Sequence, residues 1–115
     1  MTEQENATQV ELVSSIMQNY PEAGRGCALQ CTHWKYDALE FEFLDEETDK
    51  FYKVIKSDLL LALELCLSEK VWPKGCTQFP RHLTEGTADD WLCQSDATDH
   101  DAFVQIAIFG EVIYG

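Results

Sequence analysis

The stretch ALEFEFLDEETDKFYKVIK, residues 38–56, decides the fold. In LEFEF, residues 39–43, apolar side chains alternate with two glutamates. This alternation is typical of a strand with one buried face and one face in water. The polar run DEETD, residues 45–49, predicts a hairpin loop, and KFYKVIK, residues 50–56, predicts a returning antiparallel strand.

Upstream of this hairpin, CALQCTHWKY, residues 27–36, predicts an earlier strand, with a turn or bulge at Asp37. The start of the chain predicts a helix from Thr8 to Tyr20, because its apolar residues recur at helical spacing. The sequence TQVE at residues 8–11 fits a capping box at the start of this helix, and Pro21 is expected to end it.

Downstream of the hairpin the apolar period changes from two to that of a helix. SDLLLALELCLSEK, residues 57–70, predicts a leucine-rich helix capped by Ser57 and covered on most sides. A long irregular segment follows, and TADDWLCQS predicts a short helix capped by Thr87. TDHD predicts a last helix capped by Thr98, which Gly110 ends.

Together these elements predict an α+β fold, a small antiparallel sheet of three or more strands covered on one face by helices. The 115 residues and 45% hydrophobic content fit a single globular domain, residues 1–115, with residues 1–7 disordered. The order of one helix, three strands and a helix resembles that of bacterial secretion chaperones, which are also small and acidic. That resemblance implies a protein-binding function.

Charge and cysteine content restrict the function and the compartment. The chain carries 21 acidic residues against 8 lysines and arginines, and no lysine or arginine follows Arg81. Such a field repels nucleic acids and anionic lipids and attracts basic partners. We expect no membrane segment and no export signal, because no apolar run approaches about 20 residues. Five cysteines, an odd number, then indicate reduced thiols in the cytoplasm.

The positions of the cysteines and histidines suggest two alternative kinds of site, a zinc site and a nucleophilic pair. Cys31 and His33 could share a zinc ion with Cys76 and His82, but the spacing matches no standard zinc motif. Cys31 with His33, or Cys93 with His100, could form a nucleophilic pair. The acidic surroundings of Cys93 disfavour a thiolate there. We therefore predict no catalytic residue, no metal site and no cofactor.

Acidic and aromatic residues supply the predicted binding surface. The run EGTADDWLCQSDATDHD, residues 85–101, is rich in carboxylates but does not match an EF-hand calcium loop. Counted from Asp96, position 6 of such a loop is Asp101 and not the glycine that an EF-hand requires. We expect first-turn acids of two helices to bind a basic partner, together with two aromatic residues of the long loop. The predicted partner-binding residues are Asp89, Asp90, Asp99, Asp101, Trp72 and Phe79.

Two function classes follow. The first is a non-enzymatic acidic protein-interaction module, of the inhibitor, immunity or chaperone type, that binds a basic or amphipathic protein partner. The alternative is a small ligand-binding domain or enzyme with a pocket between the sheet and the 72–86 loop. The apolar closing run also predicts a homodimer, because a short chain has few elements left to cover it. The predicted contact residues are Val104, Ile108, Val112 and Tyr114.

Overall fold

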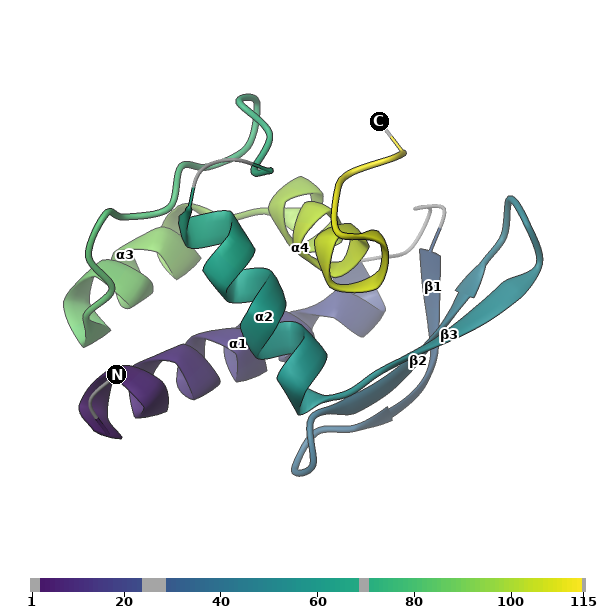
Figure 1. The fold of residues 1–115 in the computed structure, drawn as a ribbon, viewed down its shortest axis with the longest axis horizontal. Helices are drawn as coiled ribbons and strands as arrows, with labels where there is room; N and C mark the ends of the chain where they lie inside the picture. Colours follow the sequence, from purple (N-terminus) through teal and green to yellow (C-terminus); the bar gives the residue numbers. More distant parts are fainter. Residues whose placement is uncertain (1–2, 24–28, 69–70, 115) are drawn as a thin grey trace.

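A computed structural model describes residues 3–23, 29–68 and 71–114. Figure 1 shows an α+β arrangement in which a three-stranded sheet stands beside a group of helices, as the sequence predicts. In chain order the elements are α1 (Glu3–Ala23), β1 (Leu29–Lys35), β2 (Glu40–Asp45), β3 (Lys50–Val54), α2 (Lys56–Leu67), α3 (Glu85–Gln94) and α4 (Ala97–Phe109).

The sheet has the order β1-β2-β3, and both pairs of neighbouring strands are antiparallel. The two predicted turns are confirmed. At the first, Leu39 adopts a φ of 52° and its amide donates to the carbonyl of Tyr36 at 3.1 Å. At the second, Asp49 adopts a φ of 58° and its amide donates to the carbonyl of Asp45 at 2.8 Å.

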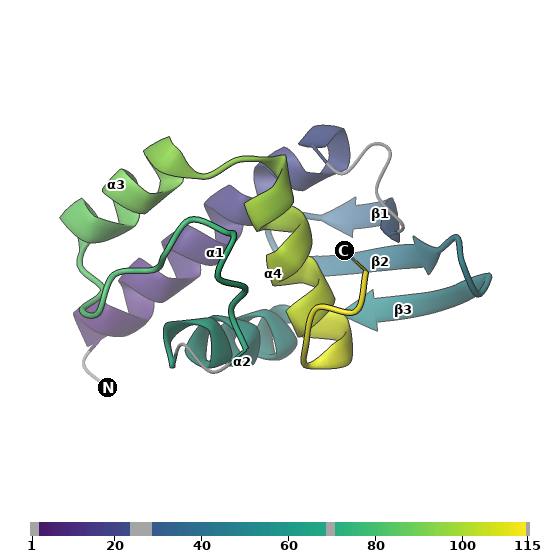
Figure 2. The same cartoon turned by 90° about the horizontal axis from the view of Figure 1, so that it is seen from above.

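One face of the sheet packs against the helices, and the other is open. Phe41, Phe43 and Val54 are buried, whereas Glu40 and Glu42 keep part of their surface in water. Figure 2 shows α4 lying across the strands with α1 behind it. The alternation in LEFEF therefore predicts the buried face correctly.

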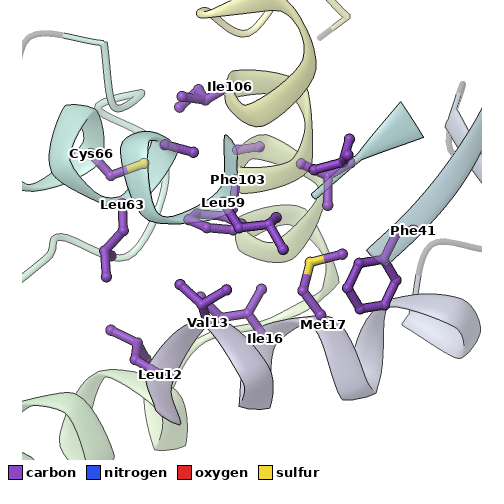
Figure 3. Packing of buried hydrophobic residues seen from close by; sticks show 14 of the residues in the cluster. Leu12, Val13, Ile16, Met17, Phe41, Leu59, Leu63, Cys66, Phe103 and Ile106 are labelled. Atoms are coloured by element: carbon purple, nitrogen blue, oxygen red, sulfur yellow. The ribbon is translucent and has the colours of Figure 1, made fainter. Parts of the chain in front are cut away.

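The core lies where α1, α2 and α4 meet. Val13 and Ile16 of α1 face Leu59 and Leu63 of α2, and Phe103 of α4 lies between them (Figure 3). All five side chains are buried. Each contributes roughly 1.5–3 kcal/mol through removal of apolar surface from water. The leucine-rich α2 is thus covered over much of its surface, but Leu61 stays exposed.

Helix α1 is longer than the sequence predicts. It begins at Glu3 rather than Thr8, so residues 3–7 belong to the helix, and Thr8 lies inside it instead of capping it. It also continues past Pro21 to Ala23. A proline this close to a helix end removes only one helical hydrogen bond, which the buried apolar stripe of α1 outweighs.

The start of α2 differs from the prediction by two residues. The N-cap is Ile55 rather than Ser57, and the helix begins at Lys56. The carboxylate of Asp58 accepts a hydrogen bond of 3.0 Å from the Ile55 amide, which satisfies one of the amides that a helix start leaves without a partner. An acidic side chain here also complements the positive helix end, as the sequence predicts for Asp58.

The caps of α3 and α4 also lie upstream of their predicted positions. Thr84 caps α3 and accepts from the amide of Thr87 at 3.2 Å, so Thr87 is the third helical residue and not the cap. Asp96 caps α4 in place of Thr98, and accepts from the amide of Asp99 at 3.1 Å. Threonines and aspartates recur here at three-residue spacing, so several registers satisfy the capping pattern equally well.

Candidate functional site

The two aromatic residues predicted to bind a partner are part of the core. Trp72 and Phe79 are 6% and 3% exposed, and Phe79 stacks on Trp91 with ring centroids 4.3 Å apart. Both indole N–H groups donate to the carbonyl of Thr77, at 3.0 Å from Trp72 and 2.9 Å from Trp91. This corrects the sequence prediction, because the aromatic residues fasten the 71–84 segment to α3 instead of lying at the surface.

Asp99 is likewise a structural residue. Its side chain is 1% exposed, and its carboxylate accepts from the amides of Thr77 at 2.8 Å and Asp96 at 3.0 Å. A buried carboxylate with these partners cannot contact another protein in this conformation. Asp99 is therefore removed from the predicted binding surface.

Asp89 and Asp90, the two predicted acids that belong to α3, are exposed and line two separate hollows. A groove of about 220 Å³ runs between α1 and α3, and its acidic lining residues are Glu11, Glu85 and Asp89. Asp90 lines a second hollow of about 170 Å³ on another side of α3, beside Pro80. The structure thus separates Asp89 from Asp90, although they are neighbours in the sequence.

Sequence reasoning missed the α1 side of this groove. Glu11 was assigned to a helix cap, and 74 positions separate it from Glu85, its partner in the groove. No short-range pattern links residues so far apart. Leu92, which is half-buried, also lines the groove, whereas Leu12 is 1% exposed and offers it almost no surface.

Asp101, the fourth predicted acid, faces the end of the chain. It is half-buried, and its carboxylate accepts from the side-chain amide of Gln105 at 2.8 Å. Gln105 is 1% exposed and uses its carbonyl oxygen to accept from the amides of Ile113 at 2.9 Å and Tyr114 at 2.8 Å. The one polar residue of the apolar run AFVQIAIF is thus the residue that anchors the end of the chain.

Residues 111–114, here called the tail segment, turn back alongside α4 (Figure 2). Gly110 makes this turn with a φ of 79°, which ends the helix as the sequence predicts. The hydroxyl of Tyr114 donates to the carboxylate of Asp45 at 2.7 Å, and its ring meets the edge of Phe109 at 6.1 Å. The tail segment therefore covers part of the surface that the sequence assigns to a dimer.

The predicted dimer residues differ in exposure. Val104 is fully buried, with 0% of its surface exposed, and Ile108, Val112 and Tyr114 are half-buried. Val104 is accordingly a core residue and cannot form an interface in this conformation. Large exposed apolar side chains lie elsewhere, on the sheet, at the start of α2 and along that helix, and in the tail segment: Trp34, Phe51, Ile55, Leu61 and Ile113.

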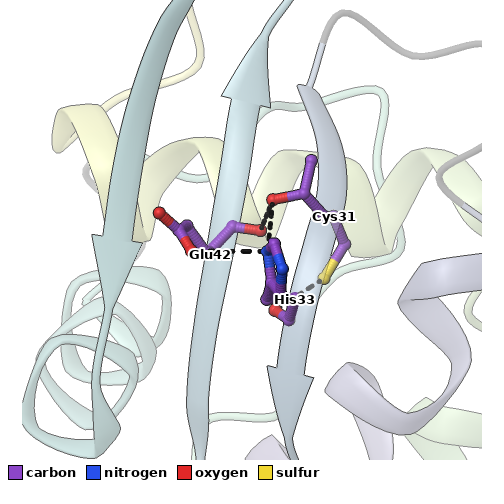
Figure 4. Close-up of polar contacts among 4 residues, drawn as sticks. Cys31, His33 and Glu42 are labelled. Atoms are coloured by element: carbon purple, nitrogen blue, oxygen red, sulfur yellow. Dashed lines mark hydrogen bonds and ion pairs between the residues drawn. The ribbon is translucent and has the colours of Figure 1, made fainter.

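A hollow of about 390 Å³ lies on the sheet. Lys35, Glu40, Glu42 and Lys53 line it together with His33, whose Nδ1 lies 3.4 Å from a carboxylate oxygen of Glu42 (Figure 4). None of its lining residues comes from the 72–86 loop, which packs on α3 and α4 instead. The predicted pocket between sheet and loop is therefore not the hollow that the sheet forms.

Charge is divided between the two sides of the molecule. Lys35, Lys50 and Lys53 belong to the sheet, and Lys56 begins the helix that follows it. Residues 82–114, which include α3 and α4, carry no lysine or arginine. Residues 82–114 are thus anionic, whereas the sheet carries both signs and the segment before α3 carries Lys74 and Arg81.

Three of the described thiols, one buried and two half-buried, are poor nucleophiles. Burial raises the pKa of Cys31 to about 11 and that of Cys66 to about 12. Burial, together with the neighbouring Asp99 carboxylate, raises the pKa of Cys76 to about 11. A thiol with such a pKa is protonated at neutral pH, so none of these three residues provides a thiolate.

His100 lies beside a hydroxyl but does not complete a catalytic triad. Its Nε2 is 3.1 Å from the Oγ of Ser95, which also donates to the carbonyl of Leu92 at 2.9 Å. Its buried Nδ1 has no hydrogen-bond partner among the described residues. A carboxylate on Nδ1 would be needed to orient the ring and stabilise its charged form.

The described residues contain neither a metal-binding group nor a membrane-spanning helix. In residues 3–23, 29–68 and 71–114, no three histidine, cysteine or acidic side chains are grouped so that they could hold a metal ion. Within the same ranges no helix has the length and apolar character needed to cross a bilayer. Cys31, His33, Cys76 and His82, the zinc ligands of the alternative that the sequence leaves open, therefore do not form such a group.

No protein-family model, curated protein or solved structure matches the chain. The function is thus inferred from the geometry of the molecule alone.

Proposed function

We propose that the chain is a non-enzymatic acidic interaction module, of the inhibitor, immunity or chaperone type, that binds a basic or amphipathic protein partner. The observation that carries this proposal is the groove between α1 and α3. There Glu11, Glu85 and Asp89 line a groove in which the half-buried Leu92 offers a small apolar strip. A lysine or arginine side chain lays its aliphatic stem on such a strip and points its charge at the carboxylates.

The charge distribution supports the same partner class. The groove is lined in part by α3, which belongs to residues 82–114, and this stretch carries no lysine or arginine. An unbalanced anionic field of this kind speeds the encounter with basic proteins and repels nucleic acids. The module functions in the cytoplasm, where the cysteines stay reduced.

The test is a titration of the isotope-labelled chain with a short peptide that alternates arginine and leucine, followed by NMR. We expect chemical-shift changes at the groove and a binding constant that falls with salt. Neutralising the groove should weaken binding about tenfold, because three charge contacts are lost. The substitutions are Glu11→Gln, Glu85→Gln and Asp89→Asn.

The matched control removes the same amount of charge from exposed acids of the two β-turns. Equal weakening by both triple variants would mean that net charge, and not the groove, attracts the peptide. Peptide contacts that map outside α1 and α3 would also contradict the proposal. The control substitutions are Asp37→Asn, Glu46→Gln and Asp49→Asn.

The hollow on the sheet favours a second candidate, a small ligand-binding domain. Its volume of about 390 Å³ suits a small molecule, and His33 and Glu42 offer it polar contacts. A ligand screen by NMR tests this candidate. Binding that survives the change of Glu42 to glutamine, or hits that map away from the sheet, would exclude this hollow.

A further inference from the structure

The side chains that hold the tail segment form a defined site. Gln105, Phe109 and Asp45 make up this tail site. Gln105 reads the backbone of two consecutive residues, because it accepts from the amides of Ile113 and Tyr114 and donates to the carbonyl of Tyr114 at 3.1 Å. Asp45 accepts from the tyrosine hydroxyl, and Phe109 contacts its ring. A separate extended peptide with a tyrosine could make every one of these contacts.

The tail segment itself contributes little to the core. Glu111 is exposed, Ile113 is 46% exposed and Val112 is half-buried. Polar contacts to the tail site therefore hold the segment in place more than apolar burial does. Segments anchored in this way detach more easily than core elements.

The tail segment covers two polar side chains of the tail site. Gln105 and Asp45 are each 1% exposed with the segment in place, and both would give up hydrogen bonds to it if it left. A ligand that offers the same two amides, carbonyl and hydroxyl restores these hydrogen bonds. The tail segment of a second copy of the chain has the same sequence and offers all of these groups.

We propose that the tail site is a peptide-binding site whose ligand is the tail segment of a second copy, exchanged symmetrically between two chains. Gly110 is the hinge, because its left-handed φ of 79° is what directs the segment back onto its own helix. Residues 110–112 span about 10 Å when extended, which sets the distance between the two α4 ends. Such exchange is a common route to two-fold dimers.

The first test measures peptide binding to the full chain. A fluorescent peptide EVIYG, residues 111–115, should bind the Tyr114→Ala chain about tenfold more tightly than the unchanged chain, whose own tail segment competes. A peptide with phenylalanine in place of the tyrosine should bind about tenfold more weakly, because Asp45 lacks its donor. Absence of binding to a cooperatively folded Tyr114→Ala chain, or equal binding of the two peptides, would overturn the site.

The second test keeps the tail residues unchanged and alters only the hinge. Gly75→Ala is the matched control for Gly110→Ala, because an added Cβ meets no atom within 4 Å at either position. The two glycines differ in backbone conformation: Gly110 has a φ of 79°, which an alanine adopts only with strain, and Gly75 does not have a positive φ. Sedimentation should show a dimer fraction several-fold larger for Gly110→Ala than for Gly75→Ala. A chain that stays monomeric with either substitution at every concentration would overturn the exchange. These results are independent of the arginine-peptide titration, which concerns a groove between other helices.

Discussion

The amide of Thr77 donates a hydrogen bond of 2.8 Å to the carboxylate of Asp99. This contact joins the irregular segment before α3 to the first turn of α4, 22 positions further along the chain. The same carboxylate also accepts from the amide of Asp96, so one buried side chain satisfies a loop and a helix start. Asp99 therefore determines where the Trp72 and Phe79 segment lies.

Replacing Asp99 by asparagine should destabilise the fold by about 2 kcal/mol, because one of its two acceptor oxygens becomes a donor that faces an amide. Urea unfolding followed by tryptophan fluorescence measures the loss. Asp89→Asn is the matched control, since Asp89 is exposed and its neutralisation should change stability by less than about 0.5 kcal/mol. Equal stabilities of the two variants would contradict the structural role of Asp99.

His100 should make stability depend on pH above the range in which carboxylates titrate. Burial lowers its pKa below the ordinary value, although Asp99 and Asp96 oppose this shift. A histidine whose folded pKa is lowered stabilises the protein above its unfolded pKa of about 6.5, and this contribution is lost as the pH falls through the folded pKa. We expect the free energy of unfolding to fall as the pH drops below about 6.5.

The His100→Leu variant should lose less stability over the same pH range, and His82→Gln should behave like the unchanged chain because His82 is exposed. Thermal melts in a series of buffers compare the three proteins. If His100→Leu shows the same pH profile as the unchanged chain, another group causes the dependence.

Tyr114 should ionise at a higher pH than an ordinary tyrosine. Its hydrogen bond to Asp45, together with burial, raises its pKa to about 12. Since the folded pKa lies above the unfolded one, the stabilisation is present below about pH 10 and is lost as the pH rises toward 12. Tyrosinate absorbance should show one late step, absent in Tyr114→Phe and moved to lower pH in Asp45→Asn. An unchanged late step in Asp45→Asn would contradict the contact.

Thiol labelling should separate the described cysteines. Cys93 is exposed, whereas burial raises the pKa of Cys31, Cys66 and Cys76 to about 11 or 12. At neutral pH an alkylating reagent should therefore modify Cys93 first and the other three much more slowly. Mass spectrometry of peptides locates the label at each site. Fast modification of Cys66 in the folded protein would contradict its burial.

The sheet is the part of the fold that the sequence predicts best. The alternation in LEFEF and the polar DEETD loop identify a strand, its buried face and its turn, because these signals act between residues that are close in the chain. The sequence predicts the first residues of the helices less accurately. At α4 both Asp96 and Thr98 satisfy the local capping pattern, and tertiary contacts such as that of Thr77 with Asp99 select the register.

The binding surface was predictable only in part. Asp89 lies in the groove as an exposed acid, but Trp72, Phe79 and Asp99 are buried, since aromatic rings and paired carboxylates gain stability inside the protein. The sequence does not predict that Glu11 lines the groove, because the other acidic lining residues belong to a helix far along the chain. Likewise, no sequence pattern shows that Gln105 binds the backbone of residues 113 and 114.

The division of charge gives the molecule an electric polarity. Four described lysines lie on the sheet and at the start of α2, and Lys74 lies in the segment before α3, while residues 82–114 carry acids without any lysine or arginine. A positively charged resin should therefore hold the protein in more than one orientation, because residues 82–114 and the exposed acids of the β2–β3 turn, Glu46, Glu47 and Asp49, both offer it negative charge.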